Sequence, residues 1–136
     1  MIIETFYRTS VKALIKHSEG KILLSKEENG MWELLGGGLD HGETPQTGLV
    51  REVQEETGLK VHSIAIQPSY YVTFPVVERN YYAANVIFEA KIDNLDFTPS
   101  DECIDLQYFS PEEILEREDM YNNVKMLAKL IIESQS

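Results

Sequence analysis

Apolar and polar positions along the chain predict a series of strands. Alternation over residues 8–16 predicts a strand, and Ser18-Glu19-Gly20 predicts a turn that leads into a second strand, so that the two form a hairpin. A short apolar run from Trp32 to Leu35 ends at three consecutive glycines, Gly36 to Gly38, which we expect to form a loop. The remaining predictions are the returning strand at 21–25, further strands at 61–67, 70–74 and 81–92, and a turn at 75–80.

Helix signals stand at three further places. Thr44 at the N-cap and Pro45 at the first helical position predict a helix that runs to about Thr57, where Gly58 ends it in a left-handed conformation. Ser110, Pro111 and Glu113 form a capping box. A final helix is expected at 119–133, and its apolar face consists of Met120, Val124, Leu127 and Ile131. Residues 1–136 therefore predict one domain of the α/β or α+β class with a mixed sheet.

The helix expected at 45–57 carries an unusual arrangement of charge. On a helical wheel Leu49, Val50 and Val53 form the core face, whereas three glutamates stand together on another face: Glu52, Glu55 and Glu56. Like charges three and four residues apart destabilise a helix, and acids are disfavoured near its C-terminus. One interpretation is an ordinary solvated acidic face. The other is a site for a hard divalent cation such as Mg²⁺, which binds carboxylate and carbonyl oxygens and is favoured by the adjoining glycine segment.

Composition and charge narrow the functional classes. The chain has 136 residues and a formal net charge of −11, which argues against binding to a nucleic-acid polymer. A small polyanionic substrate would also be repelled unless divalent cations reverse the local sign. No apolar run approaches the ~18 residues of a membrane span, and the first residues do not resemble a signal peptide. Cys103 is the only cysteine, so a cytoplasmic protein without disulfides is expected.

The acidic helix and the glycines before it resemble a known motif. Gly37, Glu43 and the segment from Arg51 to Leu59, with sequence REVQEETGL, match the Nudix box GX5EX7REUXEEXGU at every fixed position. Trp32 before the glycines and the sequence GETPQ at residues 42–46 resemble the MutT-like branch. The hairpin before the box and YFSPEEIL after it are also similar to Nudix proteins.

The resemblance implies an α/β/α sandwich and hydrolysis, dependent on Mg²⁺ or Mn²⁺, of a nucleoside diphosphate linked to another moiety. By position it implies metal ligands at Glu52, Glu55, Glu56 and the carbonyl of Gly36. Gly37, Glu43 and Gly58 would support the box. Arg51 is expected to pair with Glu43 or Glu55 and so to connect the loop with the helix.

One carboxylate would take a proton from the attacking water. It would come from Glu55, Glu56 or a later loop, where Glu102 is our candidate. The alternative is that Asp101 and Glu102 are ordinary surface acids. Three positions depart from the usual pattern without removing a metal ligand: Leu35 for proline, Asp40 for glutamate and Gly48 for alanine.

The substrate remains open at this point. Tyr70, Tyr82 and Arg79 are candidate contacts to a base or a phosphate, although tyrosines also serve in sheet packing. Pro75, sixteen residues after Leu59, resembles the proline marker of ADP-ribose pyrophosphatases. The MutT-like resemblance favours a nucleoside triphosphate pyrophosphohydrolase of the MutT type, and this is the function we expect. The alternatives are an ADP-ribose or nucleotide-sugar pyrophosphatase and a regulator that binds a nucleotide without hydrolysing it, and the oligomeric state is open.

Overall fold

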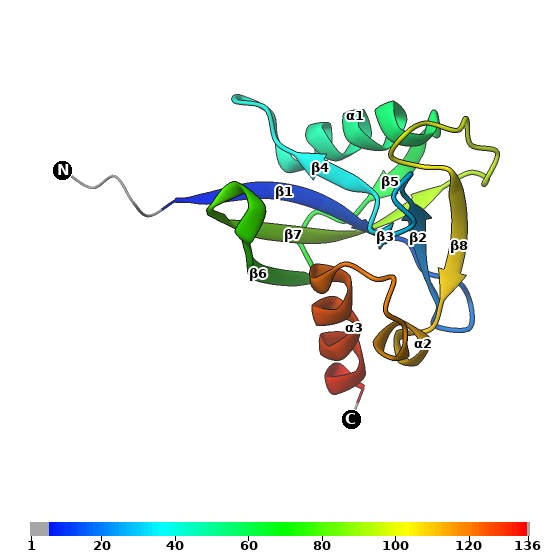
Figure 1. Ribbon diagram of the computed structural model, residues 1–136. Helices are drawn as coiled ribbons and strands as arrows, with labels where there is room; N and C mark the ends of the chain where they lie inside the picture. The colour runs from blue at the N-terminus through cyan, green and yellow to red at the C-terminus, as the bar shows by residue number, and fades with distance from the viewer. Residues whose placement is uncertain (1–5, 136) are drawn as a thin grey trace.

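The computed structural model describes residues 6–135 of the chain. Residues 1–5 and 136 lie outside this range. They include both ends of the domain predicted over residues 1–136 and the first residues of the segment that we compared with a signal peptide. Eight strands, one 3-10 helix and three α-helices follow one another along them (Figure 1). They are β1 (Tyr7–Leu14), β2 (Ile22–Lys26), β3 (Trp32–Glu33), β4 (Gly36–Gly38), α1 (Pro45–Thr57), β5 (Val61–Ile64), β6 (Tyr70–Val76), η1 (Val77–Arg79), β7 (Tyr81–Ile92), β8 (Asp105–Phe109), α2 (Pro111–Glu116) and α3 (Asn122–Ser134).

The strands form two sheets. In the larger sheet β1 lies between β4 and β7, antiparallel to β4 and parallel to β7. Both β5 and β6 pair antiparallel with β7, β6 along its first half and β5 along its last residues. The smaller sheet has the antiparallel order β3-β2-β8. The expected mixed sheet is confirmed in the larger of the two.

The hairpin expected from the first two strands forms only at its turn. The N–H of His17 donates to the carbonyl of Lys21 at 2.8 Å, and Lys16 and Ile22 form an isolated bridge. Beyond the turn β1 and β2 separate into different sheets. The reason is that β4 and β7 occupy both edges of β1, whereas β3 and β8 occupy both edges of β2.

Three further expectations need correction, and one strand was missed. The three glycines are not a loop but strand β4, whose residues pair with Ser10 to Lys12 of β1. Strand β8 was not expected from the sequence and pairs with β2 along its whole length. Pro75 belongs to β6 rather than to a turn, at an edge strand where a missing N–H is tolerated. Helix α3 begins at Asn122, three residues later than expected.

Two apolar cores lie on opposite faces of the larger sheet. Helix α1 buries Leu49 and Val53 on one face, whereas Val50 stays 40% exposed and does not join the expected core face. Helix α3 buries its expected apolar face on the other side, with Val124, Leu127 and Ile131. The α/β/α arrangement is therefore confirmed, and Figure 1 shows α1 above the sheet and α2 and α3 below it. Within the described residues no helix is long and apolar enough to cross a membrane.

Candidate metal centre

Helix α1 is fixed at both ends by the residues expected to cap it. The Thr44 hydroxyl accepts a hydrogen bond from the N–H of Thr47 at 3.1 Å, and Pro45 opens the first turn. Gly58 adopts a left-handed conformation with φ of 72° and donates its N–H to the carbonyl of Gln54. These caps fix where the helix begins and ends. With Leu49 and Val53 buried in the core, Glu52 and Glu56 lie against the glycines of β4.

Three carboxylates converge between α1 and the segment before β8. One oxygen each of Glu52, Glu56 and Glu102 lie within 4.8 Å of one another. Glu56 is only 4% exposed and accepts a hydrogen bond from the N–H of Gly36 at 2.8 Å. The structure thus brings together Glu52, Glu56, Glu102 and the backbone of Gly36, four of the residues singled out in the sequence.

The electrostatics of this group favour a bound cation. Burial raises the pKa of Glu56 to about 8, an effect that the nearby Lys12 and the Gly36 N–H oppose and the neighbouring Glu102 and Glu52 reinforce. Burial also raises the pKa of Glu52 above its usual range, against the lowering effect of Arg51. A buried carboxylate is costly as an anion unless positive charge compensates it. All available donors are oxygens, the set that Mg²⁺ and Mn²⁺ prefer, so the residues present fit such an ion.

Glu102 reaches this group because its loop is anchored on two sides. The Ser100 hydroxyl donates to the carbonyl of Glu56 at 2.6 Å, and the N–H of Thr98 donates to the carbonyl of Thr57 at 2.8 Å. On the other side the N–H of Glu28 donates to the carbonyl of Asp101 at 2.9 Å. The loop is thus tied both to the end of α1 and to the turn between β2 and β3.

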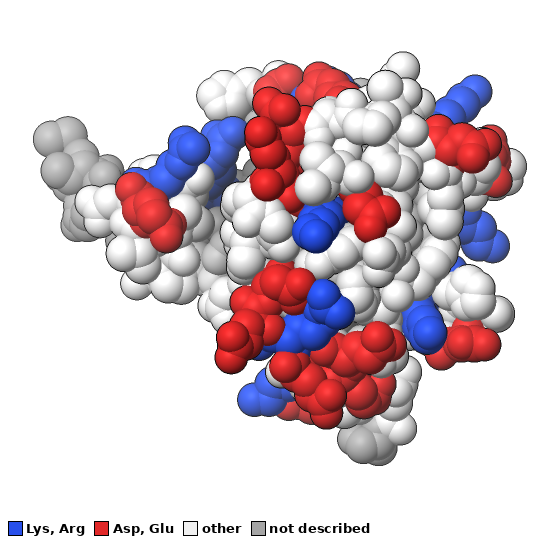
Figure 2. Space-filling model, turned by 45° about the vertical axis from the view of Figure 1, so that its right-hand side comes forward, with Lys and Arg blue, Asp and Glu red and all other residues white. Residues whose placement is uncertain are grey.

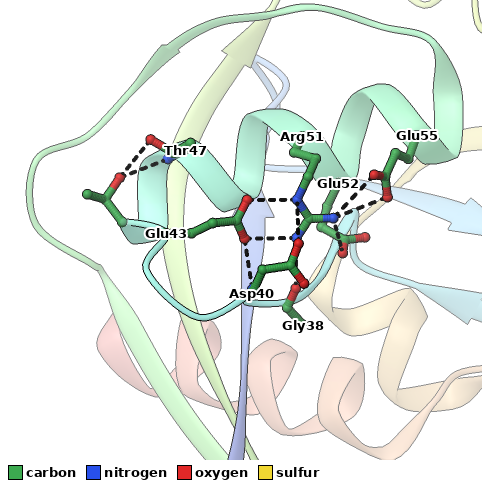
Figure 3. Close-up of polar contacts among 8 residues, drawn as sticks. Gly38, Asp40, Glu43, Thr47, Arg51, Glu52 and Glu55 are labelled. Atoms are coloured by element: carbon green, nitrogen blue, oxygen red, sulfur yellow. Dashed lines mark hydrogen bonds and ion pairs between the residues drawn. The ribbon is translucent and has the colours of Figure 1, made fainter.

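Arg51 organises the carboxylates on the outer side of α1 (Figure 3). Its guanidinium donates from Nε and Nη2 to the two carboxylate oxygens of Glu43, at 2.7 and 2.9 Å. Nη1 donates to Glu52 at 3.0 Å and Nη2 to the carbonyl of Gly38 at 3.0 Å. Asp40 adds an ion pair at 3.5 Å. The expected connection between loop and helix through Arg51 and Glu43 is present, and it also holds Glu52.

Glu55 lies away from the three converging carboxylates. Its side chain is 60% exposed and accepts hydrogen bonds from Nη1 of Arg51 at 3.2 and 3.3 Å. In this arrangement Glu102 occupies the place beside Glu52 and Glu56 that the sequence assigned to Glu55. The role of Glu55 as a metal ligand stays a prediction.

The glycines of β4 allow the sheet to approach α1 closely. Gly36 has a φ of 130°, and a Cβ there would collide with the backbone of Val11. At Gly37 a Cβ would lie 2.5 Å from a carboxylate oxygen of Glu52. A side chain at either position would therefore displace the backbone or the carboxylates.

Sequence reasoning missed one residue at this site, Lys12. Lys12 is 7% exposed, and its Nζ donates to the carbonyl of Gly36 at 3.3 Å and to that of Leu34 at 3.4 Å. The signal was a lysine within the run Val11 to Ile15, all of which is buried. A charged side chain inside a buried strand segment points to a polar site on that face of the sheet.

The candidate substrate contacts lie on β6, η1 and β7. Tyr70 packs against the core beneath α3, and its hydroxyl lies 3.1 Å from the hydroxyl of Ser134. Tyr82 is 54% exposed, and its ring lies 5.7 Å from that of Tyr7. Arg79 is exposed at the end of η1. Figure 2 shows several separate clusters of acidic side chains with basic side chains near them, while other residues make up much of that face. The clusters agree with the net charge of −11.

Comparison with known proteins identifies this arrangement. The family profile described as the NUDIX domain matches residues 6–130. The chain belongs to the Nudix family. Nudix hydrolases depend in general on divalent metals, and the cluster of Glu52, Glu56 and Glu102 is a possible place for one.

Individual Nudix relatives support the MutT-like branch. A MutT-like protein of Streptomyces ambofaciens is 33% identical over 112 residues, which are 82% of this chain and 69% of that protein. Nucleoside triphosphatase NudI of Enterobacter sp. (strain 638) is 29% identical over 120 residues, which cover 79% of this chain and 84% of that protein. The crystal structure of a MutT protein from Methanosarcina mazei Go1 superposes with a TM-score of 0.82 at 27% identity and covers 99% of both chains. In several other curated relatives the matched part is only 32% to 40% of their length. The chain is thus a Nudix pyrophosphohydrolase of the MutT-like branch.

Proposed function

We propose that this Nudix chain hydrolyses a nucleoside diphosphate linked to another moiety, with Mg²⁺ or Mn²⁺ as cofactor, as a nucleoside triphosphate pyrophosphohydrolase of the MutT type. The observation that carries the proposal is the convergence of Glu52, Glu56 and Glu102, with Glu56 almost fully buried. Such a group stabilises little by itself, because its members repel one another. It becomes favourable when a divalent cation and a bound diphosphate complete it.

In this proposal the carboxylates of Glu52 and Glu56 and the carbonyl of Gly36 hold the metal, Glu55 is a further predicted ligand, and Glu102 lies beside Glu52 and Glu56. A divalent cation bound there supplies positive charge for the phosphate oxygens and lowers the pKa of an attacking water. Arg51 acts as a positioning residue, since it holds Glu52 and the segment after β4. Glu102 is exposed at the mouth of the group and is the first candidate to accept the proton of the water, with Glu55 as the other.

Nucleoside triphosphates are the substrates we favour. The relative NudI is named a nucleoside triphosphatase, and this chain covers 84% of its length. Tyr82 offers an exposed ring for stacking on a base, and Arg79 an exposed cation for phosphate. Tyr70 is the weaker candidate, because its side chain is engaged by the core and by Ser134.

A panel of substrates tests this proposal. Nucleoside triphosphates, ADP-ribose, nucleotide sugars and dinucleoside polyphosphates would each be incubated with the protein in Mg²⁺, in Mn²⁺ and in EDTA. We expect product from triphosphates with either metal and none in EDTA. Turnover of ADP-ribose or nucleotide sugars alone would favour the alternative substrate class. Inactivity across the panel with metal present would favour a regulator that binds nucleotide without hydrolysis.

A further inference from the structure

Lys12 is a buried cation next to the proposed metal ligands. It lies on β1, in the three residues that pair with β4, and its side chain is 9% exposed. Its Nζ is within hydrogen-bonding distance of the carbonyls of Gly36 and Leu34, at 3.3 and 3.4 Å. The carboxylate of Glu33 lies 4.0 Å away. An ammonium group carries three donors, and these three neighbours lie around it.

Lys12 lies on the interior side of the acidic group formed by Glu52, Glu56 and Glu102. Its Nζ donates to the carbonyl of Gly36, and the N–H of the same residue donates to the buried carboxylate of Glu56 at 2.8 Å. Arg51, by contrast, contacts the group from the outer side through Glu52. Two interior carboxylates, Glu33 at 4.0 Å and Glu56 through Gly36, are therefore connected to a positive charge before any metal binds.

Lys12 and a metal would share one ligand. The carbonyl of Gly36 is a proposed metal ligand, and the same oxygen accepts the hydrogen bond from Nζ. A carbonyl oxygen has two lone pairs and can serve both partners. Two positive charges on one oxygen repel each other, and this repulsion is strong where little water screens it.

We propose that Lys12 is a positioning residue that holds the Gly36 carbonyl and the interior carboxylates in place in the metal-free protein, and that its charge lowers the affinity of the site for divalent ions. The inference rests on the proposed function, because it concerns the same metal site. It gives Lys12 two opposite effects. The metal-free site is stabilised, and the bound ion is held less tightly.

Substitution of Lys12 by methionine tests this inference. Met retains most of the length and apolar volume of the side chain and removes the charge. In titration calorimetry with Mn²⁺ alone, K12M should bind the ion about tenfold more tightly than the original chain. The free energy of unfolding in EDTA should be lower in K12M, and saturating Mn²⁺ should close most of the difference. A role in packing alone would lower stability equally with and without Mn²⁺.

Two further variants make the result decisive. K12Q keeps a hydrogen-bond donor but no charge, so it should also tighten Mn²⁺ binding, and it replaces K12M if that variant does not fold. K16M removes the same charge from an exposed residue that follows the same strand and pairs with Glu89, and should leave Mn²⁺ affinity unchanged. Unchanged or weaker Mn²⁺ binding in K12M and K12Q, with normal binding in the original chain, would overturn the inference alone. Absence of Mn²⁺ binding in the original chain would overturn the proposed metal site as well.

Discussion

The two sides of helix α1 place glutamates in opposite environments. On the outer side Arg51 engages exposed Glu55 and Asp40 and the partly buried Glu43. The pKa of Glu43 is lowered to about 2, chiefly by its hydrogen bonds from Arg51. On the inner side burial raises the pKa of Glu56 to about 8, although Lys12 is near. Glu52 belongs to both sides, because it contacts Arg51 and also lies beside Glu56.

This difference separates two uses of negative charge. Glu43 and Asp40 have their compensating cation, Arg51, within the chain, so they contribute structure and need no ligand. The inner carboxylates are only partly compensated, and the proposed metal ion would complete their arrangement. The acidic motif of the sequence thus contains a clamp on one side and a proposed metal site on the other.

The largest effect should come from removing the inner charge. In Glu56→Gln the amide keeps the size of the side chain but is a poor metal ligand. We expect kcat with Mg²⁺ to fall by about 10² to 10⁴ or more, while circular dichroism shows an unchanged fold. Glu116→Gln, on the exposed face of α2, removes the same charge and should keep the original kcat. Turnover of Glu56→Gln close to that of the original chain would contradict the role given to Glu56.

The second effect concerns the pH dependence of stability without metal. The pKa of Glu56 is about 8 in the folded chain and near the ordinary 4.5 when unfolded. The folded state therefore retains a proton that the unfolded state releases, so stability is full below pH 4.5 and falls as the pH rises towards 8. The raised pKa of Glu52 acts in the same direction. The loss should be on the order of a few kcal/mol.

Urea denaturation in EDTA between pH 5 and pH 8 measures this loss. Saturating Mg²⁺ should remove most of it, because the ion compensates the ionised carboxylates. Glu56→Gln should show a flatter profile in EDTA. An equally steep decline in that variant would mean that another group causes the pH dependence.

Local signals in the sequence were enough to predict α1 and its acidic face. Thr44, Pro45 and Gly58 act through hydrogen bonds and φ preferences within a few residues, so the predicted limits of the helix agree with the structure. The same holds for the capping box at Ser110 and Glu113. The resemblance to the Nudix box supplied the fold, since local signals do not specify how distant strands pair.

Features that depend on distant partners could not be predicted in the same way. The division of β1 and β2 between two sheets follows from which strands occupy their edges, and no local pattern records that choice. Glu102 was a candidate from the resemblance, but its place beside Glu56 depends on Ser100 and Thr98, which bind the end of α1. The bond from Ser100 spans 44 residues of the chain. The burial of Lys12 likewise requires β4 and β7 on both sides of β1.

The smallest effect should come from loosening the outer clamp. Arg51→Lys keeps a positive charge but loses the planar fork that binds both oxygens of Glu43, so Glu52 and the segment after β4 should be held less firmly. We expect kcat/KM to fall by about tenfold and the urea midpoint to be lower at pH 6. The lowered pKa of Glu43 gives stability that is present above pH 4.5 and is lost as the pH falls towards 2, so the urea midpoints of Arg51→Lys and the unsubstituted chain should converge in acid.

A control is Arg117→Lys, at a second arginine that makes two hydrogen bonds to one carboxylate, that of Asp119. This variant should leave kcat/KM unchanged. If Arg51→Lys lowered turnover as much as Glu56→Gln, the outer side would be part of the chemistry, and the contrast between the two sides of α1 would fail.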